Sequence, residues 1–244
     1  MVLYSYAGKI LRVNLSDKTI KTEDTKKDVA QLLLGGNGYA AKILWDELKP
    51  GIDPLSPENK IVLMTGPITG TGAPGSGFWE ACFKSPLTGV WGESACGGWW
   101  GPMLKFAGFD GIIIEGASKD PVYLWVHDGE AEIKPAEGIW GQTVPKTEEL
   151  VRREIGVPQA RVLSIGPAGE KLVRFAGIAV DLERYAGRKG GGALLGSKKV
   201  KAIAVYGEKE IPIAKPAEYS KALKECEQAV YASLNSGGGF PWGT

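Results

Sequence analysis

The sequence has few of the residues that most often build metal and redox sites. It contains one histidine and three cysteines in 244 residues. The cysteines, Cys82, Cys96 and Cys226, are odd in number and widely spaced, so they encode neither a disulfide framework nor a CxxC metal site. The single histidine, His127, precedes an Asp-Gly turn signal and is expected to be an exposed turn residue rather than a catalytic base.

The sequence also lacks a charge imbalance and long apolar runs. With 29 basic and 28 acidic side chains, no global field attracts nucleic acid or an anionic membrane, so any anion site must be local. Lys9 and Arg12 interrupt the N-terminal stretch before it reaches the length of a signal peptide, and no later segment approaches about 18 uncharged apolar residues. We therefore expect a cytoplasmic protein without nucleic-acid or membrane partners.

Glycine is abundant, with 35 residues and no collagen-like period. It is concentrated with large aromatic rings between Lys84 and Glu115. Glycine lets a backbone approach a flat ligand and rings supply an apolar wall, so this stretch favours either a ligand cradle or an ordinary aromatic core. In the same region Glu80 and Glu93 could be buried acids near a ligand, and Cys96 is expected to be a buried thiol.

Apolar runs predict a set of short strands. Their ranges are 11–15, 19–22, 61–65, 78–83, 112–114, 122–126, 131–133, 161–165, 173–179 and 200–205. The pair 122–126 and 131–133 is expected to form a hairpin around Asp128-Gly129. Helices are expected over 28–34, over 39–48 with Trp45 on the apolar face, and from Thr143 or Thr147 to about Ile155.

Two glycine motifs resemble nucleotide-binding loops without meeting their requirements. Gly70, Gly72 and Gly75 match G-x-G-x-x-G, but a strand rather than a helix is expected to follow them. Near the end of the chain the order is Gly-x-x-x-x-Gly-Ser-Lys, whereas a P-loop needs the lysine before the hydroxyl residue. Hydrolysis of a nucleoside triphosphate is therefore not expected.

The segment DLERYAGRKGGGALLGSKKVK, residues 181–201, is the most basic candidate site. Arg184 and Arg188 lie four residues apart, and Lys189 and three glycines precede a helical turn at 193–196. Guanidinium forks and free N–H groups at a helix start suit a phosphate or pyrophosphate. A solvated basic turn is the alternative.

Two features concern domain organisation. A strand followed by Gly-Pro occurs at 61–67 and at 161–167, which suggests two related halves. After Pro216, Tyr219, Leu223, Cys226 and Val230 recur with the spacing of an amphipathic helix. Such a helix either packs on its own domain or begins a further one, and we expect that the chain is part of a larger protein.

Taken together, several segments resemble the N-terminal domain of the aldehyde:ferredoxin oxidoreductase family, the tungsten bis-pterin enzymes. The resemblance covers residues 5–215. Its motifs are GKILRVNLSDKTI, LGGNGYAAKIL, DPLSPENKIVLMTGPITGT, KSPLTG, ACGGWWGPMLKFAGFDGIIIEG, VLSIGPAGE and RYAGRKGGGALLGSKKVKAIAV. The resemblance implies an α+β fold of two packed, largely antiparallel sheet layers with short helices. Residues 1–212 would form the tungstopterin-binding domain and residues 213–244 the beginning of a helical domain.

The resemblance also implies site residues. The pterin and phosphate positions fall on Phe78, Ala95, Gly97, Arg184, Tyr185, Gly187 and Arg188, and the Mg²⁺ ligands would be the backbone carbonyls of Ala95 and Tyr185. This sequence departs from the family at two of them. Phe78 stands where an arginine is usual, which removes a phosphate fork, and Ala95 stands where an asparagine is usual, which leaves the carbonyl in place. In this interpretation Trp99 and Trp100 are packing residues.

The implied function is that of the cofactor-carrying portion of a tungsten enzyme, with molybdenum as the alternative metal. An aldehyde or related acyl-level substrate would be oxidised, and electrons would pass through a 4Fe-4S cluster to ferredoxin or a ferredoxin-like subunit. The cluster ligands and the catalytic residues would lie outside these 244 residues, in the rest of its own chain, so the fragment alone is expected to be inactive. A homo-oligomer is compatible with the family. The alternative is a non-catalytic module that binds a pterin or a phosphate or serves assembly.

Overall fold

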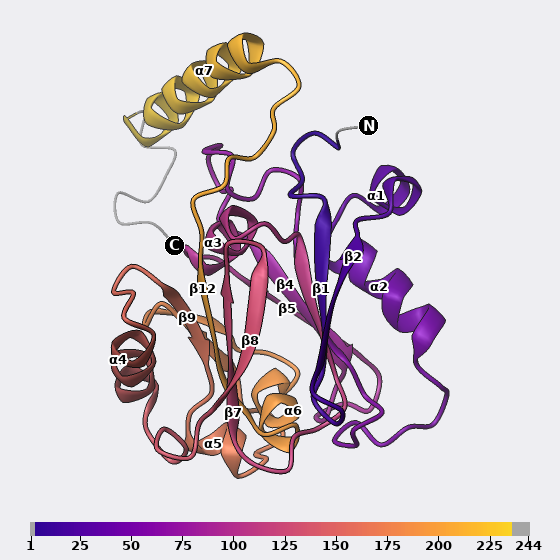
Figure 1. Ribbon diagram of the computed structural model, residues 1–244. Coiled ribbons are helices and arrows are strands. Elements are labelled where there is room, and N and C mark those ends of the chain that lie inside the picture. Colours follow the sequence, from indigo (N-terminus) through magenta and orange to yellow (C-terminus); the bar gives the residue numbers. More distant parts are fainter. Residues whose placement is uncertain (1–2, 236–244) are drawn as a thin grey trace.

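The computed structural model describes residues 3–235, apart from the side chains of the last three of them. Its framework is a pair of six-stranded sheets (Figure 1). The first sheet, in the order β2-β1-β6-β3-β4-β5, contains β1 (Lys9–Asn14), β2 (Thr19–Asp24), β3 (Ile61–Thr65), β4 (Trp79–Lys84), β5 (Trp91–Cys96) and β6 (Gly111–Glu115).

The second sheet is built from the later part of the chain. In the order β8-β7-β12-β9-β10-β11, it contains β7 (Val122–His127), β8 (Glu130–Pro135), β9 (Arg161–Ser164), β10 (Ile178–Val180), β11 (Arg184–Ala186) and β12 (Val200–Tyr206). The helices are α1 (Lys27–Leu33), α2 (Gly36–Glu47), α3 (Trp100–Phe106), α4 (Val144–Ile155), α5 (Pro167–Glu170), α6 (Gly191–Ser197) and α7 (Pro216–Asn235).

The two sheets have the same topology. Adding six to each strand number of the first sheet gives the order of the second, and in each sheet one strand pair is parallel, β1 with β6 and β7 with β12. The helices follow the same rule, because α2 and α4 each precede the third strand of their half and α3 and α6 each precede the sixth. The predicted α+β fold with two largely antiparallel, duplicated sheets is therefore confirmed.

The predicted Gly-Pro repeat marks equivalent positions in the two halves. Gly66-Pro67 follows β3, and Gly166-Pro167 follows β9. The register agrees, because Leu63 pairs with Ile112 of β6 as Leu163 pairs with Ile203 of β12. Residues 100 apart in β3 and β9 thus occupy the same place in their sheets.

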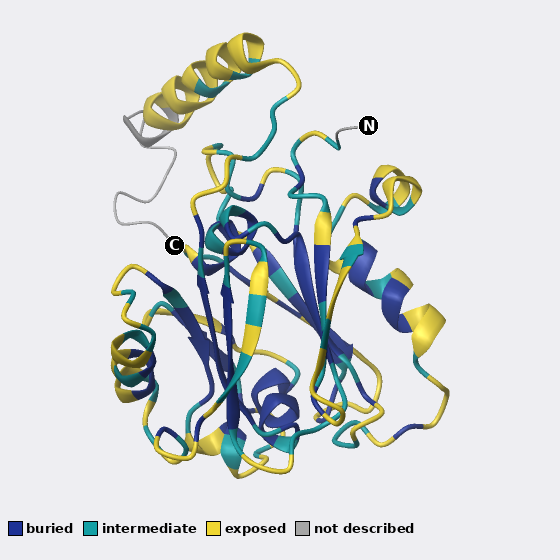
Figure 2. Ribbon diagram, in the orientation of Figure 1, coloured by how far each residue is buried: buried dark blue, intermediate teal, exposed yellow. Residues whose placement is uncertain are grey.

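Burial explains the layered arrangement. The largest apolar cluster joins the inner faces of both sheets and includes Trp100 of α3 and Leu194 of α6. Separate clusters lie under α2 on the outer face of the first sheet and at Val151 of α4 on the second. Figure 2 shows the buried residues concentrated in the central strands and α6. The apolar runs of the sequence became strands because both faces of these strands are covered.

Two sequence predictions about this core are wrong. Trp45 is 86% exposed, because α2 buries Tyr39, Ala40, Ile43 and Leu44 and the next residue is rotated away from that face. The strand predicted over 173–179 exists only as β10, since the residues before Ile178 form turns in which Ala176 N–H donates to Val173 O. The hairpin predicted around Asp128-Gly129 is confirmed by the pairing of His127 with Glu130.

The helix predicted after Pro216 is α7, which stands apart from the sheets in Figure 1. Tyr219 Oη donates to Thr71 Oγ1 at 2.7 Å, and Tyr219 and Leu223 are half-buried, whereas Cys226 and Val230 are exposed. Among residues 3–235 no helix combines the length and the apolar character needed to span a bilayer.

Candidate functional site

The structure brings the two candidate segments of the sequence together where an edge of one sheet meets an edge of the other. β5 is an edge strand of the first sheet and β11 an edge strand of the second. The Arg188 N–H donates to Ser94 Oγ at 3.1 Å, and the Trp99 N–H donates to Asp181 Oδ2 at 2.8 Å. The glycine-rich stretch and the Arg184–Arg188 segment therefore line one junction, although about ninety residues separate them in the chain.

The register predicts which backbone groups of β5 are free at this junction. The Ser85 N–H donates to Val90 O, and antiparallel pairs alternate between those that exchange hydrogen bonds and those that do not. Every second pair counted from Ser85–Val90 exchanges hydrogen bonds, and the Glu80–Ala95 pair falls between two of these, so it exchanges none. Because β5 is the last strand of its sheet in the described part of the chain, the N–H and C=O of Ala95 point out from the sheet edge.

The same argument applies to β11 in the second sheet. The Asp181 N–H donates to Val162 O, so every second residue of β10, Ala179 among them, directs its backbone N–H and C=O to β9. The Ala179–Tyr185 pair between β10 and β11 therefore exchanges no hydrogen bonds. The N–H and C=O of Tyr185 then also point out from a free edge.

Ala95 and Tyr185 are equivalent residues of the duplicated halves. Met64 of β3 pairs with Glu80, which pairs with Ala95. One hundred residues after Met64, Ser164 of β9 pairs with Ala179, which pairs with Tyr185. The two carbonyls thus come from matching positions on the two edge strands that meet.

The charged groups around these carbonyls suit an anion. Arg184 and Arg188 are exposed, and within the described residues neither guanidinium forms an ion pair. Gly187 is exposed as well, and a Cβ built on Gly97 would meet nothing within 4 Å, so the backbone is accessible at both positions. Unpaired guanidinium groups of this kind can take a phosphate in a bidentate manner.

Phe78, by contrast, presents an apolar ring. It lies just before β4 with 59% of its surface exposed, beside a cleft of about 220 Å³ that is also lined by Gly36 and Glu80. A phenyl ring cannot donate to a phosphate, so the contact that an arginine would make is missing here. Tyr185 is similarly exposed, at 57%.

Glu80 and Glu93 lie near one another on the face of the sheet that carries Ala95. Burial raises the pKa of Glu80 to about 7, and the nearby Glu93 carboxylate adds to the effect. Glu80 Oε2 is buried and has no hydrogen-bond partner among the described residues, whereas Glu93 is exposed and its Oε2 accepts from Asn37 Nδ2 at 3.2 Å. Glu80 can therefore carry a proton near neutral pH.

One element of the predicted phosphate site is wrong. The start of α6 is not open to a ligand, because Gly190, Gly191 and Gly192 are buried and the Gly192 N–H donates to Ala176 O at 2.8 Å. These glycines permit close packing instead, since a Cβ on Gly192 would lie 2.3 Å from Gly177 O. Lys198 is the lysine of the Gly-x-x-x-x-Gly-Ser-Lys motif that resembles a P-loop. It is buried and donates to Asn59 O at 2.5 Å, so it is not available to a phosphate.

Other expectations agree with the structure. Gly70, Gly72 and Gly75 have positive φ angles in turns that lead into β4, so no dinucleotide-binding helix follows them. Cys96 is a buried thiol, and burial raises its pKa to about 12. His127 is the exception, because it was predicted to be an exposed turn residue but is half-buried at the end of β7, stacked on Trp125 with ring centroids 4.9 Å apart.

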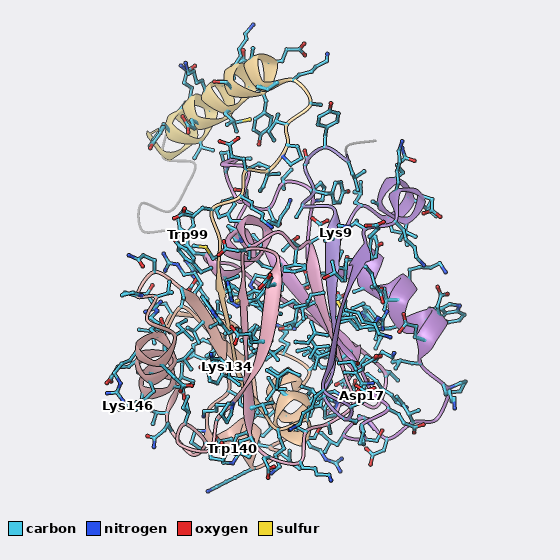
Figure 3. The ribbon with its side chains drawn as sticks, in the orientation of Figure 1. Lys9, Asp17, Trp99, Lys134, Trp140 and Lys146 are labelled. Carbon is cyan, nitrogen blue, oxygen red and sulfur yellow. The ribbon has the colours of Figure 1, made fainter. Side chains whose placement is uncertain are left out.

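The two neighbouring tryptophans differ. Trp100 is fully buried against Trp79, as expected of a packing residue, but Trp99 is 60% exposed at the start of α3 (Figure 3). Sequence reasoning also missed Asp181 and Arg161, which hold Trp99 in place. Only the two consecutive positive φ angles at Asp181 and Leu182 single out this turn, and they are visible in the structure alone.

The donor set at the junction fits a bis-pterin group with its Mg²⁺. Two backbone carbonyls on free edges are the hard oxygen ligands that Mg²⁺ prefers, and two exposed arginines suit the phosphates. Gly98 shows how closely the walls approach, because a Cβ there would lie 3.0 Å from Asp181 Oδ2. In the described part of the chain, no cluster of three or more His, Cys, Asp and Glu side chains could hold a metal ion.

The chain is similar in sequence to known proteins. Residues 10–207 match the family model for the N-terminal domain of aldehyde ferredoxin oxidoreductase. Tungsten-containing aldehyde ferredoxin oxidoreductases of Pyrococcus abyssi and Pyrococcus furiosus are each 44% identical over 239 residues, which is 98% of this chain and 39% and 40% of theirs. The chain thus spans about two fifths of the length of these relatives.

A solved structure shows the same fold. The active-site complex BamBC of benzoyl coenzyme A reductase, in complex with 1,5-dienoyl-CoA, superposes with a TM-score of 0.91 at 37% sequence identity, covering 96% of this chain and 35% of that one. The family model covers most of the chain and the same topology recurs in a related enzyme. The chain therefore belongs to the aldehyde ferredoxin oxidoreductase family, whose N-terminal domain it contains.

Proposed function

We propose that this chain is the cofactor-carrying part of a tungsten-dependent oxidoreductase that oxidises aldehydes or related acyl-level substrates to acids. The observation that carries the proposal is the pair of equivalent edge carbonyls, Ala95 and Tyr185, next to the unpaired Arg184 and Arg188. Tungsten and ferredoxin enter the proposal because both appear in the names of the relatives. A bound tungsten bis-pterin would supply the two-electron redox chemistry, and a 4Fe-4S cluster held outside this chain would pass the electrons to ferredoxin.

In this proposal the residues of the chain bind and orient the cofactor. Arg184 and Arg188 would hold its phosphates, the carbonyls of Ala95 and Tyr185 would hold Mg²⁺, and Gly97 and Gly187 would let the backbone approach. Phe78 would contribute an apolar contact instead of a phosphate fork. Residues 1–212 would form this unit and residues from 213 the start of a helical domain. The cytoplasmic location remains a prediction.

The test is the composition of the natural polypeptide that carries this sequence. Metal analysis should find tungsten or molybdenum, and denaturation should release a pterin. Arg188→Ala should lower the bound pterin by about tenfold, because a charge-assisted contact to phosphate contributes about 1.5 to 3 kcal/mol. Arg153→Ala, which removes an exposed arginine of α4, is the matched control and should retain full occupancy. A wild-type protein without either metal and without pterin would contradict the proposal.

A second candidate is the conversion of a cyclic acyl-CoA substrate, favoured by the likeness to the BamBC complex at a TM-score of 0.91. Dye-linked assays of the purified protein separate the two candidates. Turnover of simple aldehydes supports the first, and turnover of a dienoyl-CoA without turnover of aldehydes supports the second.

A further inference from the structure

The side chain of Trp99 is exposed to solvent rather than packed in the core. It is 60% exposed, whereas its neighbour Trp100 is fully buried. Burial of an aromatic side chain is normally favourable, since it removes about 150 to 250 Å² from water. An indole that stays exposed next to a candidate ligand site is therefore available for a contact that the described residues do not make.

Three interactions hold Trp99 in place, and one of them involves its ring. The backbone N–H of Trp99 donates to Asp181 Oδ2 at 2.8 Å, and the other oxygen of Asp181 lies 3.9 Å from Arg161 Nη1. The guanidinium carbon of Arg161 lies over the Trp99 ring, 5.9 Å from its centroid. The three residues form a closed set in which a cation covers one face of the ring, which leaves the opposite face to solvent or a ligand.

The surroundings of this set indicate a built site. The side chain of Asp181 is only 10% exposed, and within residues 3–235 neither its Oδ1 nor the buried Nε of Arg161 has a hydrogen-bond partner. Gly98, directly before Trp99, has a φ of +99°, and a Cβ there would lie 3.4 Å from Arg184 Cγ. Trp99 is therefore the residue next to Gly98, whose backbone lies close to the side chain of Arg184.

We infer that Trp99 stacks on the planar ring of the phosphorylated ligand that Arg184 and Arg188 hold. The inference rests on the proposed function, under which that ligand is a pterin. A flat heteroaromatic ring stacks on an indole face, and the phosphate reaches the neighbouring guanidinium groups. Arg161 and Asp181 are then positioning residues, which act on the ligand only through the indole.

The test measures pterin retention by the natural polypeptide that carries this sequence, expressed in a host that makes the tungsten cofactor. The protein is diluted, and the half-time of pterin loss is followed through the fluorescence of the oxidised pterin. Trp99→Leu should shorten the half-time by about tenfold, and Trp99→Phe by less, because it keeps a smaller ring. Trp45→Leu, which removes an even more exposed indole on α2, is the control and should leave the half-time unchanged.

Arg161→Met gives a second, independent variant. It removes the cation that supports the indole without touching the ring, so an intermediate loss of retention is expected. Thermal unfolding of the cofactor-free variants should be close to that of the wild type, since the ring is mostly exposed. If Trp99→Leu does not fold, Trp99→Phe and Arg161→Met still decide the question.

The outcomes separate the inference from the proposed function. A wild type that releases pterin while Trp99→Leu and Trp45→Leu retain it equally overturns the inference and leaves the proposed function standing. A wild type that releases no pterin even on denaturation contradicts the proposed function itself. Mass analysis of the released compound identifies the ring, and an adenine nucleotide in place of a pterin overturns both.

Discussion

Glu80 is a titratable residue beside the proposed site, on the strand that pairs with β5. It is half-buried opposite Ala95, and burial together with Glu93 raises its pKa from 4.5 to about 7. The folded protein therefore keeps a proton on Glu80 that the unfolded chain releases. The stabilisation from this proton is fully present below pH 4.5 and is lost as the pH rises through 7.

Glu80→Gln should remove this pH dependence. Relative to the wild type, the variant should gain about 1 to 2 kcal/mol of stability between pH 5 and pH 8, because its amide cannot ionise. Urea unfolding of the cofactor-free protein at both pH values measures the gain. Glu137→Gln, at an exposed carboxylate, should show none, and an equal response of the two variants would refute the assigned environment of Glu80.

Local sequence motifs point to part of the candidate site but not to all of it. Arg184, Arg188 and Gly97 stand in short motifs with a recognisable composition. Asp181 and Arg161 do not, because their role arises from contacts with Trp99, and the hydrogen bond between Asp181 and Trp99 spans 82 residues. The exposure of Trp99 was wrongly predicted for the same reason.

Among the elements, α6 shows why a glycine cluster was misinterpreted. Its glycines face other parts of the protein rather than a ligand, Gly191 the side chains of Ile178 and Phe83 and the other two neighbouring backbone. A Cβ on Gly196 would lie 2.0 Å from Gly169 O of α5. Short apolar strands such as β3 and β12 were predictable, because a continuous run of apolar residues needs cover on both faces. Helix-to-helix proximity leaves no such pattern in one sequence.

Gly196→Ala should therefore destabilise the protein by about 3 kcal/mol, since the added methyl group meets backbone atoms that cannot move aside. Chemical denaturation of the variant measures the change. Gly138→Ala is the matched control, because a Cβ there meets nothing within 4 Å and Gly138 does not have a positive φ. A neutral effect of Gly196→Ala would show that α5 and α6 are not packed as closely as described.

At the scale of the whole molecule, the duplication accounts for the location of the site. Each half ends its sheet with a free edge, β5 in one and β11 in the other, and the two edges meet. Because the halves share one topology, the meeting point presents matched backbone groups from both. A ligand with two similar ends, such as a bis-pterin, suits a junction of this kind.

The duplicated sheets should fold without α7. The linker is tied to the body before the helix begins, because the Ser5 N–H donates to Pro212 O at 2.7 Å. Within the described part of α7, a side-chain hydrogen bond to the body joins Tyr219 to Thr71. A chain ending at Ile213 should therefore unfold within about 3 °C of the 244-residue chain, as followed by circular dichroism. A chain ending at Lys199 is the contrasting control, because it lacks β12, which lies between β7 and β9 in the second sheet, and it should not fold. A large loss of stability in the longer truncation would mean that α7 belongs to the first folding unit, and the proposed boundary near residue 212 would then be wrong.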